Sequence, residues 1–446
     1  MANHNDICIG IDLGTTNSVM AWGRIDSDGP IQANVIDIPM LAADGTVKKA
    51  PLLPSCIYFD DVENRPIVGE YGKYLIGKEA ERVVKSIKLK MGEHKREKIG
   101  SVYYTAPEIS TRILSQLKES AKQTFFRNIP FPDNVVIAVP ASFEPKMRKA
   151  TKTAGEYGGL FKNVTLVDEP VAVLHDFNNR LHKSDIPDRF DFSSSKTILV
   201  FDLGGGTLDV TLSTVEYGQN SYDLEVFDIV KPKRCVMIAG NNFDQKLSKF
   251  LLKKYMEKRP TALDISKQEM RYLESKFLLH AEEAKIDLSN QSELSKLFSS
   301  EELDPESICA EIEIEAYEDE LFIHELKLSE YKKCVESLLA PGRELKDVDQ
   351  FNPELDPKDI IDPILEVLKQ AQVNLNLDAP PKPDAVLLNG SMAKLPMIQE
   401  RLETFFGFAP DPVGDSDLAI ARGAIIWWAT EMRKQRKPTH RRRANG

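Results

Sequence analysis

The sequence has few of the features that membrane-spanning or disulfide-bonded proteins need. Its apolar runs, such as AIIWWA and TILVF, fall far short of the roughly 20 residues that span a bilayer, and its first residues lack the basic stretch and long apolar run of a secretory signal. The five cysteines are far apart, with no Cys-x-x-Cys pair and no histidine at metal-ligand spacing. We therefore expect no membrane span, reduced cysteines and a cytoplasmic location.

An excess of positive charge is also missing. The 446 residues include 58 Lys and Arg against 69 Asp and Glu, a formal net charge of −11, which argues against general nucleic-acid affinity. The last 16 residues are the exception, with seven basic residues and one Glu, so the preceding 430 residues carry 51 − 68 = −17. We interpret the basic tail, 433–446, as a solvated extension; the alternative is a contact with an anionic partner such as acidic protein, RNA or membrane.

The chain contains a weak internal repeat. At roughly 150 residues per domain its length allows two to four domains, and a hydrophobic content of 42% excludes disorder over the whole chain. Residues 7–25 and 197–215 both alternate apolar and polar positions around a glycine-containing turn, which is typical of a β-hairpin. Superposing IGIDLGTTNSVMA on LVFDLGGGTLDVT aligns an Asp-Leu-Gly step in both segments, so we expect two similar halves.

Each half continues with buried strands and helices. In the first half a buried strand is predicted at 135–143, and Ser142 is a candidate cap for the helix that follows it. In the second half, helical residues 268–289 and strand-like residues 310–326 form a separable insertion. The last helix, near 417–435, is expected to return to the second half.

The two turns have the composition of a phosphate site. Glycine and small hydroxyl residues let backbone N–H groups approach anionic oxygens closely, and Asp12 and Asp202, just before the turns, would hold magnesium mostly through water. Either turn alone is more simply a tight polar hairpin. Two such turns, one with three consecutive glycines at 204–206, destabilise the strands beside them. Folding alone would not favour such turns, so the presence of two copies supports phosphate binding. A GxxxxGK[ST] loop is absent, so this is not a P-loop protein.

Five motifs in order resemble one known family. IGIDLGTTNS, VFDLGGGTLDV, AVPASF with LVDEPVA, EEAKIDLS and LLNGSMAKLP, spread over about residues 6 to 432, resemble the ATPase domain of the seventy-kilodalton heat-shock (DnaK-type) chaperones. The resemblance implies an α/β actin-like ATPase fold whose two lobes are each built on a ribonuclease-H-like mixed sheet, with ATP and magnesium in the cleft between them. Lobe I would be 1–196, with an inserted subdomain at about 38–110, and lobe II 197–432, with one at about 245–330.

The same resemblance implies roles for residues at the phosphates. Asp12, Asp202 and Glu169 would hold magnesium and its waters, with potassium as a further candidate ion. Lys73 falls where the family keeps a lysine near the γ-phosphate, and with Glu169, Asp202 and Thr207 it would form the catalytic set. From the residues alone, Lys73 is more simply a solvated surface lysine, and the alternative for Glu169 is a carboxylate at a helix start. The phosphate cradle would be Gly14, Thr15, Thr16, Asn17, Gly204, Gly205, Gly206, Thr207, Asp209 and Gly240.

A second set of residues would bind adenosine. Glu282, Lys285 and Ser289 are spaced to share one helix face, where solvated helix charges are the alternative interpretation. The resemblance adds Gly390 and Ser391 at a strand end, Lys394 where an arginine usually packs on adenine, and Asp417 to close the pocket. Lysine lacks the planar surface of arginine, so adenine affinity is expected to be lower.

The sequence departs from the family in two places. The family's Gly-Gly-Glu-Asp-Phe-Asp is Ala-Gly-Asn-Asn-Phe-Asp at 239–244, which removes two carboxylates from the expected lobe interface. After Ala429 there is no acidic-leucine linker, peptide-binding domain or helical lid. We therefore expect an ATPase domain that lacks its own peptide-binding domain.

The favoured function is ATP binding and slow hydrolysis, with nucleotide-dependent lobe closure acting on a protein partner such as a co-chaperone, an exchange factor or a client-holding protein. In that case Lys73→Ala is expected to reduce hydrolysis by orders of magnitude. Two alternatives remain open: a small-molecule, sugar-type kinase of the same superfamily, and an actin-like nucleotide-binding filament or interaction protein.

Overall fold

The computed structural model describes most of the chain. The described residues are 6–25, 29–60, 66–183, 191–218, 223–230, 233–235, 238–258, 265–298, 304–316, 320–352, 357–412 and 414–436. None of the helices formed by these residues is long and apolar enough to cross a bilayer. The four cysteines whose side chains are described, Cys8, Cys56, Cys309 and Cys334, carry free thiols. Residues 433–436 of the basic tail are not a solvated extension, because they form the end of the last helix, where Arg433 is 5% exposed and donates to Gly29 O at 2.6 Å. The rest of the tail lies outside the described residues.

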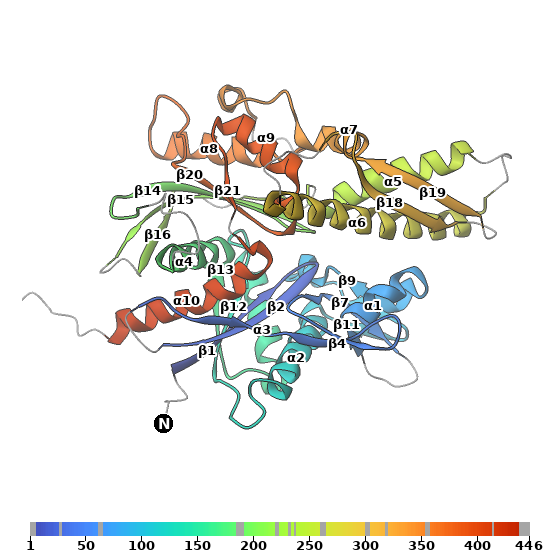
Figure 1. Ribbon diagram of the computed structural model, residues 1–446. Coiled ribbons are helices and arrows are strands. Elements are labelled where there is room, and N and C mark those ends of the chain that lie inside the picture. Colours follow the sequence, from blue (N-terminus) through green and yellow to red (C-terminus); the bar gives the residue numbers. More distant parts are fainter. Residues whose placement is uncertain are drawn as a thin grey trace, which may run out of the picture.

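Two mixed sheets, one in each half of the chain, organise the molecule (Figure 1). The strands of the first sheet are β1 (Ile7–Leu13), β2 (Asn17–Arg24), β3 (Ala33–Val35), β6 (Leu53–Pro54), β12 (Asn134–Val139) and β13 (Asn163–Asp168). The strands of the second sheet are β14 (Lys196–Leu203), β15 (Leu208–Tyr217), β16 (Leu224–Asp228), β17 (Lys233–Cys235), β20 (Ala385–Asn389) and β21 (Asp411–Pro412).

The central strands of the two sheets follow the same plan. In the first, β1 pairs antiparallel with β2 and parallel with β12; in the second, β14 pairs antiparallel with β15 and parallel with β20. Asp12 and Asp202 occupy equivalent positions, each one residue before the end of its strand. The internal repeat of the sequence therefore corresponds to two structurally equivalent hairpins.

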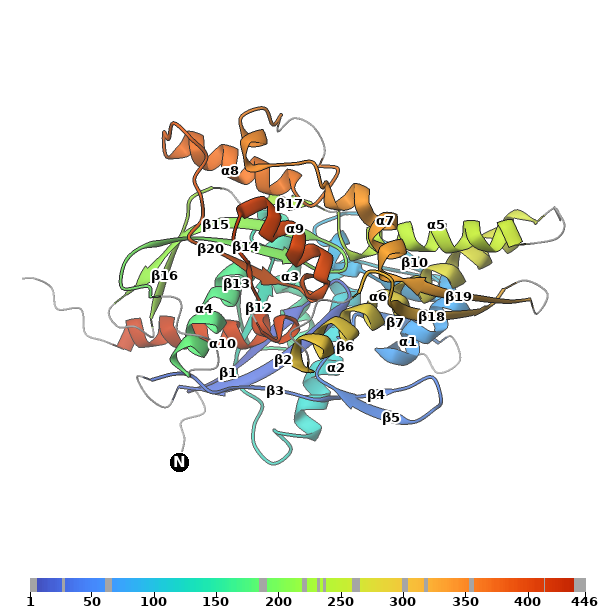
Figure 2. The same cartoon turned by 45° about the horizontal axis from the view of Figure 1, so that its top comes forward.

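Each half also carries an insertion, which Figure 2 shows on the same side of the molecule. The first consists of small sheets with one short helix: β4 (Ile38–Leu41), β5 (Val47–Ala50), β7 (Cys56–Phe59), β8 (Pro66–Val68), α1 (Glu70–Tyr74), β9 (Val83–Lys85), β10 (Glu97–Ile99) and β11 (Val102–Tyr104). The second consists of two long helices and a hairpin: α5 (Gly240–Lys258), α6 (Lys267–Phe298), β18 (Ile308–Glu315) and β19 (Leu321–Lys327).

Helices cover both faces of the sheets. The remaining helices are α2 (Ala106–Gln123), α3 (Pro145–Glu156), α4 (Glu169–His182), α7 (Leu328–Leu339), α8 (Asp362–Asn374), α9 (Pro396–Phe406) and α10 (Ser416–Arg436). Between the sheets, α4 and α10 pack on one another, and the apolar cluster around them takes residues from both sheets (Figure 1). This shared core joins the two lobes.

The last helix differs from the expectation. Instead of completing the second half, α10 packs mainly on α4 and on β1, β2, β3 and β12 of the first sheet. Two glycines permit the close approach: a Cβ on Gly10 would overlap the carbonyl of Ala421, and one on Gly423 would overlap the carbonyl of Ala172. The chain thus returns to the first lobe at its described end.

The predicted cap of α3 is also different. The residue before the helix is Glu144, and no side chain caps its first turn. Ser142 instead donates a hydrogen bond, 2.7 Å long, to Asp209 Oδ1 on β15 of the second lobe. The hydroxyl therefore connects the two lobes and leaves the start of the helix to Pro145, whose missing N–H suits that position.

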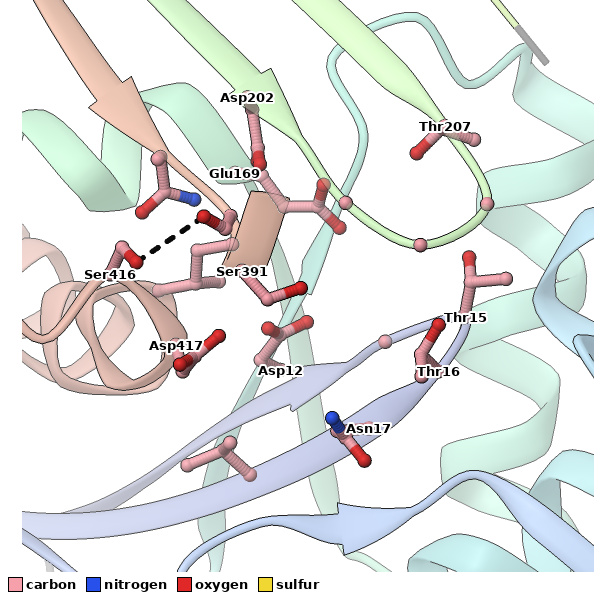
Figure 3. A pocket seen from close by; sticks show the side chains of 18 of the residues that line it. Asp12, Thr15, Thr16, Asn17, Glu169, Asp202, Thr207, Ser391, Ser416 and Asp417 are labelled. Carbon is pink, nitrogen blue, oxygen red and sulfur yellow. Dashed lines mark hydrogen bonds between the residues drawn. The ribbon is translucent and has the colours of Figure 1, made fainter. Parts of the chain in front are cut away.

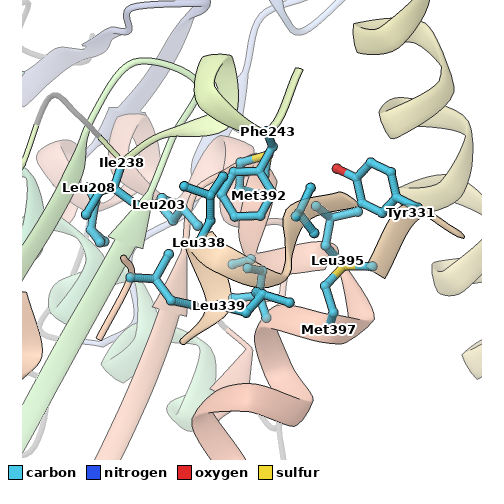
Figure 4. Packing of buried hydrophobic residues seen from close by; sticks show 14 of the residues in the cluster. Leu203, Leu208, Ile238, Phe243, Tyr331, Leu338, Leu339, Met392, Leu395 and Met397 are labelled. Carbon is cyan, nitrogen blue, oxygen red and sulfur yellow. The ribbon is translucent and has the colours of Figure 1, made fainter. Parts of the chain in front are cut away.

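The second lobe's core supports the turn between β14 and β15 from both sides. Leu203 and Leu208, which flank the turn, are fully buried in a cluster with Ile238, Phe243 and Met392 (Figure 4). Because side chains packed in a dense interior keep their positions, the turn is held on a rigid support.

Candidate functional site

The ends of β1 and β14 meet at a pocket between the two lobes, which we call the turn pocket (Figure 3). It is lined by Asp12, Gly14, Thr15, Thr16, Asn17, Val19, Leu52, Lys88, Glu169, Asp202, Gly204, Gly205, Gly206, Thr207, Asn389, Gly390, Ser391, Ser416, Asp417 and Ile420. The two hairpin turns contribute backbone and hydroxyl groups from opposite lobes. Both Gly-rich segments singled out in the sequence therefore face the same cavity.

The two turns approach each other so closely that glycine is required. A Cβ added to Gly205 would overlap the Thr16 hydroxyl, and one added to Gly206 would overlap the Thr15 side chain. The second turn is tied to the start of α5, because Gly240 N donates to Gly204 O at 3.0 Å and Asn241 N donates to Gly205 O at 2.8 Å. Gly240, predicted to bind phosphate, thus supports the turn without lining the turn pocket.

Four carboxylates line the turn pocket; Asp417 pairs with Lys394, and the other three are Asp12, Glu169 and Asp202. Burial raises the pKa of Asp12 to about 7, a shift that Lys88 reduces and Glu169 increases. Burial also raises the pKa of Asp202 well above its usual range, and the nearby Glu169 and Asp209 raise it further. Such mutual repulsion indicates that the pocket carries more negative charge than its own residues neutralise, and a cation or protons would relieve it.

The lysine of the turn pocket is Lys88, which the sequence analysis did not single out. It lies on the 3-10 helix η4 (Ile87–Lys90), is 7% exposed, and donates to Glu169 Oε1 at 2.6 Å. Burial would lower the pKa of Lys88, but the Glu169 and Asp12 carboxylates raise it above its usual value. Lys88 is therefore a buried cation among the carboxylates.

Lys73 lies elsewhere. Its ammonium on α1 pairs with Glu282 Oε1 on α6 at 2.9 Å and so bridges the two insertions. The lysine beside Glu169 in the turn pocket is Lys88. In the sequence, Lys88 lies in KSIKLK, whose alternating lysines are typical of a solvated strand or turn. The apolar Ile87, which the structure buries, was the one sign in the sequence that this segment enters the core.

A second cavity of about 250 Å³ opens beside the turn pocket, which we call the helix cavity because α6 forms one wall. It is lined by Thr16, Asn17, Leu52, Lys73, Gly205, Asn241, Asp244, Glu282, Lys285, Ile286, Ser289, Asn290, Ser391, Met392, Lys394, Leu395 and Asp417. Glu282, Lys285, Ser289 and Lys394, predicted to bind adenosine, all lie here.

The lysines of the helix cavity are paired. Besides Lys73 with Glu282, Lys285 lies 2.6 Å from Asp244 Oδ1, and Lys394 lies 2.9 Å from Asp417 Oδ2. These three pairs balance their charges within the cavity wall.

Two predicted site residues, Gly240 and Asp209, lie outside the lining of both cavities. Asp209 is 4% exposed and accepts the hydrogen bond from Ser142. Ser391 lines both cavities. Gly390, which lines the turn pocket, has φ of +85° and accepts a hydrogen bond from Ser416 Oγ at 3.3 Å (Figure 3). The predicted cradle and adenosine residues are otherwise brought together.

The two-lobed fold with paired mixed sheets and glycine turns facing one pocket defines a class of α/β proteins, and sequence comparison identifies the family. The family model described as "Hsp70 protein" matches residues 95–351. The chain belongs to the Hsp70 family, whose fold is the actin-like ATPase fold with two lobes; the predicted family and fold class are confirmed.

Several relatives match along nearly the whole chain. It is 30% identical over 426 residues to a protein named chaperone protein DnaK from Thermosipho africanus, 29% identical over 427 residues to DnaK from Thermosipho melanesiensis, and 28% identical over 421 residues to DnaK from Mycoplasmopsis synoviae. These alignments cover 94–96% of this chain but only 58–59% of the relatives.

The donor set of the turn pocket suits magnesium. Carboxylate oxygens of Asp12, Glu169 and Asp202 are the hard ligands that magnesium prefers, and magnesium commonly retains several waters. In the described part of the chain, no three His, Cys, Asp or Glu side chains are placed to hold a metal ion directly. The carboxylate donors fit a hydrated ion held through its waters.

Proposed function

We propose that this chain binds ATP with its phosphates in the turn pocket and its adenosine in the helix cavity, hydrolyses it slowly, and signals its nucleotide state to a protein partner. The observation that carries the proposal is the meeting of two glycine turns, the carboxylates of Asp12, Glu169 and Asp202, and the buried Lys88 in one pocket between two lobes. Membership of the Hsp70 family supports it. A chaperone role is a further part of what we propose. The chain spans about 59% of the length of its DnaK relatives.

The residues of the turn pocket would share the work of hydrolysis. Asp12, Glu169 and Asp202 would hold hydrated magnesium, which when bound neutralises phosphate charge and acts as a Lewis acid. The Lys88 ammonium would stabilise charge that develops on the transferring phosphoryl group, a role in which preorganised donors count most when water is excluded. Thr207 on the second turn and the backbone N–H groups of both turns would orient the phosphates.

Lys88 is proposed for the role that the sequence analysis assigned to Lys73. The pairing of Lys88 with Glu169 at 2.6 Å holds the ammonium in the turn pocket. Lys73 is proposed instead to connect the lobes, since it joins α1 to α6 through Glu282.

Two contacts between the lobes could report the nucleotide state. Lys73 with Glu282 and Ser142 with Asp209 connect the first half of the chain to the second. A phosphate chain entering between the turns would change the separation of Thr16 and Gly205, and these bridges would adjust with it. A partner that contacts both lobes would sense the change.

The proposal is tested by titrating ATP and ADP, each with magnesium, into the chain in a calorimeter, followed by single-turnover hydrolysis of bound ATP. Binding of both nucleotides and slow conversion of ATP to ADP are expected. No heat with either nucleotide would refute the proposal. Turnover that depends strongly on added sugars would indicate a kinase, and growth of light scattering with ATP would indicate a filament protein.

A further inference from the structure

One face of the two-stranded sheet formed by β18 and β19 is exposed. Its other face packs on α6, where Ile312, Ile314 and Phe322 belong to the core of the second lobe. The exposed face, which we call the hairpin face, consists of Ile308, Glu311, Glu313, Glu315, Leu321, Ile323, Glu325 and Lys327. Both views place this hairpin at the edge of the molecule (Figure 1, Figure 2), so the hairpin face is open to another molecule.

Three large apolar side chains are exposed on the hairpin face. Ile308 is 42% exposed, Leu321 51% and Ile323 57%. Single apolar residues on a surface are common, but a group of them on one face, surrounded by polar residues, is typical of surfaces that another protein covers. The apolar residues therefore indicate a contact with a polypeptide.

The same face carries an excess of negative charge. Glu311 lies directly opposite Glu325 in the antiparallel register, and like charges in that arrangement destabilise a sheet. Within the described residues, the glutamates of the hairpin face form no ion pair, and its one lysine, Lys327, is already paired with Glu306 at 2.9 Å. A cationic partner would remove this repulsion.

The nearest lysines of the supporting helices do not neutralise these glutamates. Lys276 on α6 donates to the main-chain oxygen of Glu315 at 2.6 Å, and Lys258 on α5 donates to the main-chain oxygen of Ile323 at 3.5 Å. The carboxylates of the hairpin face are therefore available to a cationic polypeptide from outside.

The chain itself contains such a polypeptide beyond the end of α10. Residues 437–446, KPTHRRRANG, include four Lys and Arg and no Asp or Glu. Arginine suits the hairpin face in two ways: its guanidinium donates two parallel hydrogen bonds to a carboxylate, and its aliphatic stem packs on apolar side chains. Both the charge and the apolar residues of the face are matched by this segment.

This segment starts on the far side of its own copy. Figures 1 and 2 place the end of α10 at Arg436 and the β18–β19 hairpin at opposite ends of the molecule. A folded chain of 446 residues is about 58 Å across. Ten extended residues span at most about 36 Å. The hairpin face within reach of residues 437–446 is therefore that of a second copy.

We propose that the hairpin face of one copy binds residues 437–446 of a second copy, with Arg441, Arg442 and Arg443 paired to its glutamates and their stems on Leu321 and Ile323. Each copy has one such face and one such segment, so the contact joins unlike surfaces and builds chains or rings of copies. The association needs no nucleotide and goes beyond the proposed function.

Sedimentation velocity of the full chain, without nucleotide and over a series of concentrations, tests the proposal. At low salt the weight-average mass is expected to rise with concentration past that of a dimer. At high salt the association should weaken about tenfold or more, because exposed ion pairs are screened.

Two variants remove one side of the contact each. Glu311→Gln combined with Glu325→Gln should weaken self-association about tenfold, and its melting temperature should stay the same or rise because two opposed charges are gone. Arg441→Gln combined with Arg442→Gln and Arg443→Gln should weaken it at least as much. An equal mixture of the two variants keeps one intact face and one intact segment, so it should form pairs but no longer assemblies.

A matched control is Glu93→Gln combined with Glu403→Gln. Both glutamates are exposed, neither lies on the hairpin face, and the change in net charge is the same as in the hairpin variant. This control should associate like the unmodified chain. An equal loss in the control would show that net charge, and not the hairpin face, governs association, and would overturn the proposal.

Three further results would overturn it. The unmodified chain could remain a monomer at every concentration, which would leave the hairpin face to a different protein. The arginine variant could associate as before, which would exclude residues 437–446. Loss in the arginine variant alone would show that the segment binds another surface. Because no nucleotide is present, each outcome is independent of the calorimetric test of the proposed function.

Discussion

The turn pocket and the helix cavity lie side by side but handle charge in opposite ways. The turn pocket holds Asp12, Glu169 and Asp202 against the single buried Lys88, and repulsion and burial raise the pKa of both aspartates. In the helix cavity each of Lys73, Lys285 and Lys394 has a carboxylate partner within 2.9 Å. The turn pocket needs a cation to balance its charge, whereas the helix cavity is already balanced.

The difference separates two kinds of contribution to a nucleotide site. Charges that neighbouring residues do not balance interact strongly with an incoming ion and with charge that develops during the reaction. Charges already paired with neighbours contribute less, because a ligand must replace an existing interaction. We therefore expect substitutions in the turn pocket to affect hydrolysis and metal binding, and substitutions in the helix cavity to cause small changes in affinity.

The largest effect should come from replacing Lys88 with alanine, compared with the same replacement at Lys73. Lys88→Ala is expected to slow single-turnover hydrolysis of bound ATP about 10²–10³-fold, because it removes a preorganised charge from a water-poor site. It also leaves Glu169 buried without its partner, at a cost of about 3–5 kcal/mol that thermal unfolding would measure. Lys73→Ala serves as the matched control and should keep hydrolysis within about tenfold. A greater loss in Lys73→Ala would reverse the assignment.

The next largest effect should come from adding a single methyl group to the second turn. Gly205→Ala would place a Cβ against the Thr16 hydroxyl, and overpacking of this kind costs about 1–3 kcal/mol, so affinity for ATP with magnesium should fall about tenfold or more. At Gly204 the nearest atom to an added Cβ is Thr207 O at 3.7 Å, so Gly204→Ala is the control. Calorimetric titration compares the two; equal losses would mean that the turns need not approach each other.

The affinity for ADP with magnesium should depend on pH through Asp12. Because the pKa of Asp12 is about 7, a proton must leave before an ion is held, so affinity should fall as pH drops below 7, by up to about tenfold per unit. Calorimetry between pH 6 and 8 measures this, with Asp12→Asn as a variant of low affinity and little pH dependence.

The free energy of unfolding should show the opposite dependence on pH. Because the Asp12 pKa is raised above that of the unfolded chain, the folded protein binds the proton more tightly, and this contribution to stability is lost as pH rises from about 4 to 7. An affinity for ADP with magnesium that did not change across pH 7 would contradict the raised pKa of Asp12, and with it the expected pH dependence of both binding and unfolding.

The smallest effect should be in the helix cavity, at Lys394. Replacing it with arginine adds a planar group that can pack on an aromatic base, worth about 0.5–1 kcal/mol, so adenosine affinity should rise about two- to fivefold. Tripolyphosphate, which has no base, should bind as before. Lys394→Met is the control and should show no gain; an equal gain in both variants would indicate that relief of the Asp417 pair, and not stacking, is responsible.

Local sequence patterns predicted the parts of the site that local structure forms. The hairpins at Asp12 and Asp202 follow from alternation and glycine, and the helix face with Glu282, Lys285 and Ser289 follows from helical spacing; the structure shows both hairpins and the continuous helix α6. That the turns come from opposite lobes and meet in one pocket followed only from the repeat and the family resemblance.

Other features could not be obtained from spacing. Lys88 lies in a lysine-rich segment that would be equally stable in water, and its partner Glu169 is 81 positions away in the sequence. Ser142 was expected to cap a helix but bonds Asp209 of the other lobe. In each case the partner is remote in sequence, and the local pattern contains no information about it.

By itself, the sequence determined the two hairpins, the carboxylates that precede their turns and the family to which the chain belongs, because strand alternation, glycine turns and motif order are local properties. Only the tertiary structure decided which lysine enters the turn pocket, that α10 packs on the first sheet, and that Ser142 bonds Asp209 of the other lobe. The physical reason is burial: the environment of a buried charge or amide depends on atoms supplied by remote segments once the lobes have packed.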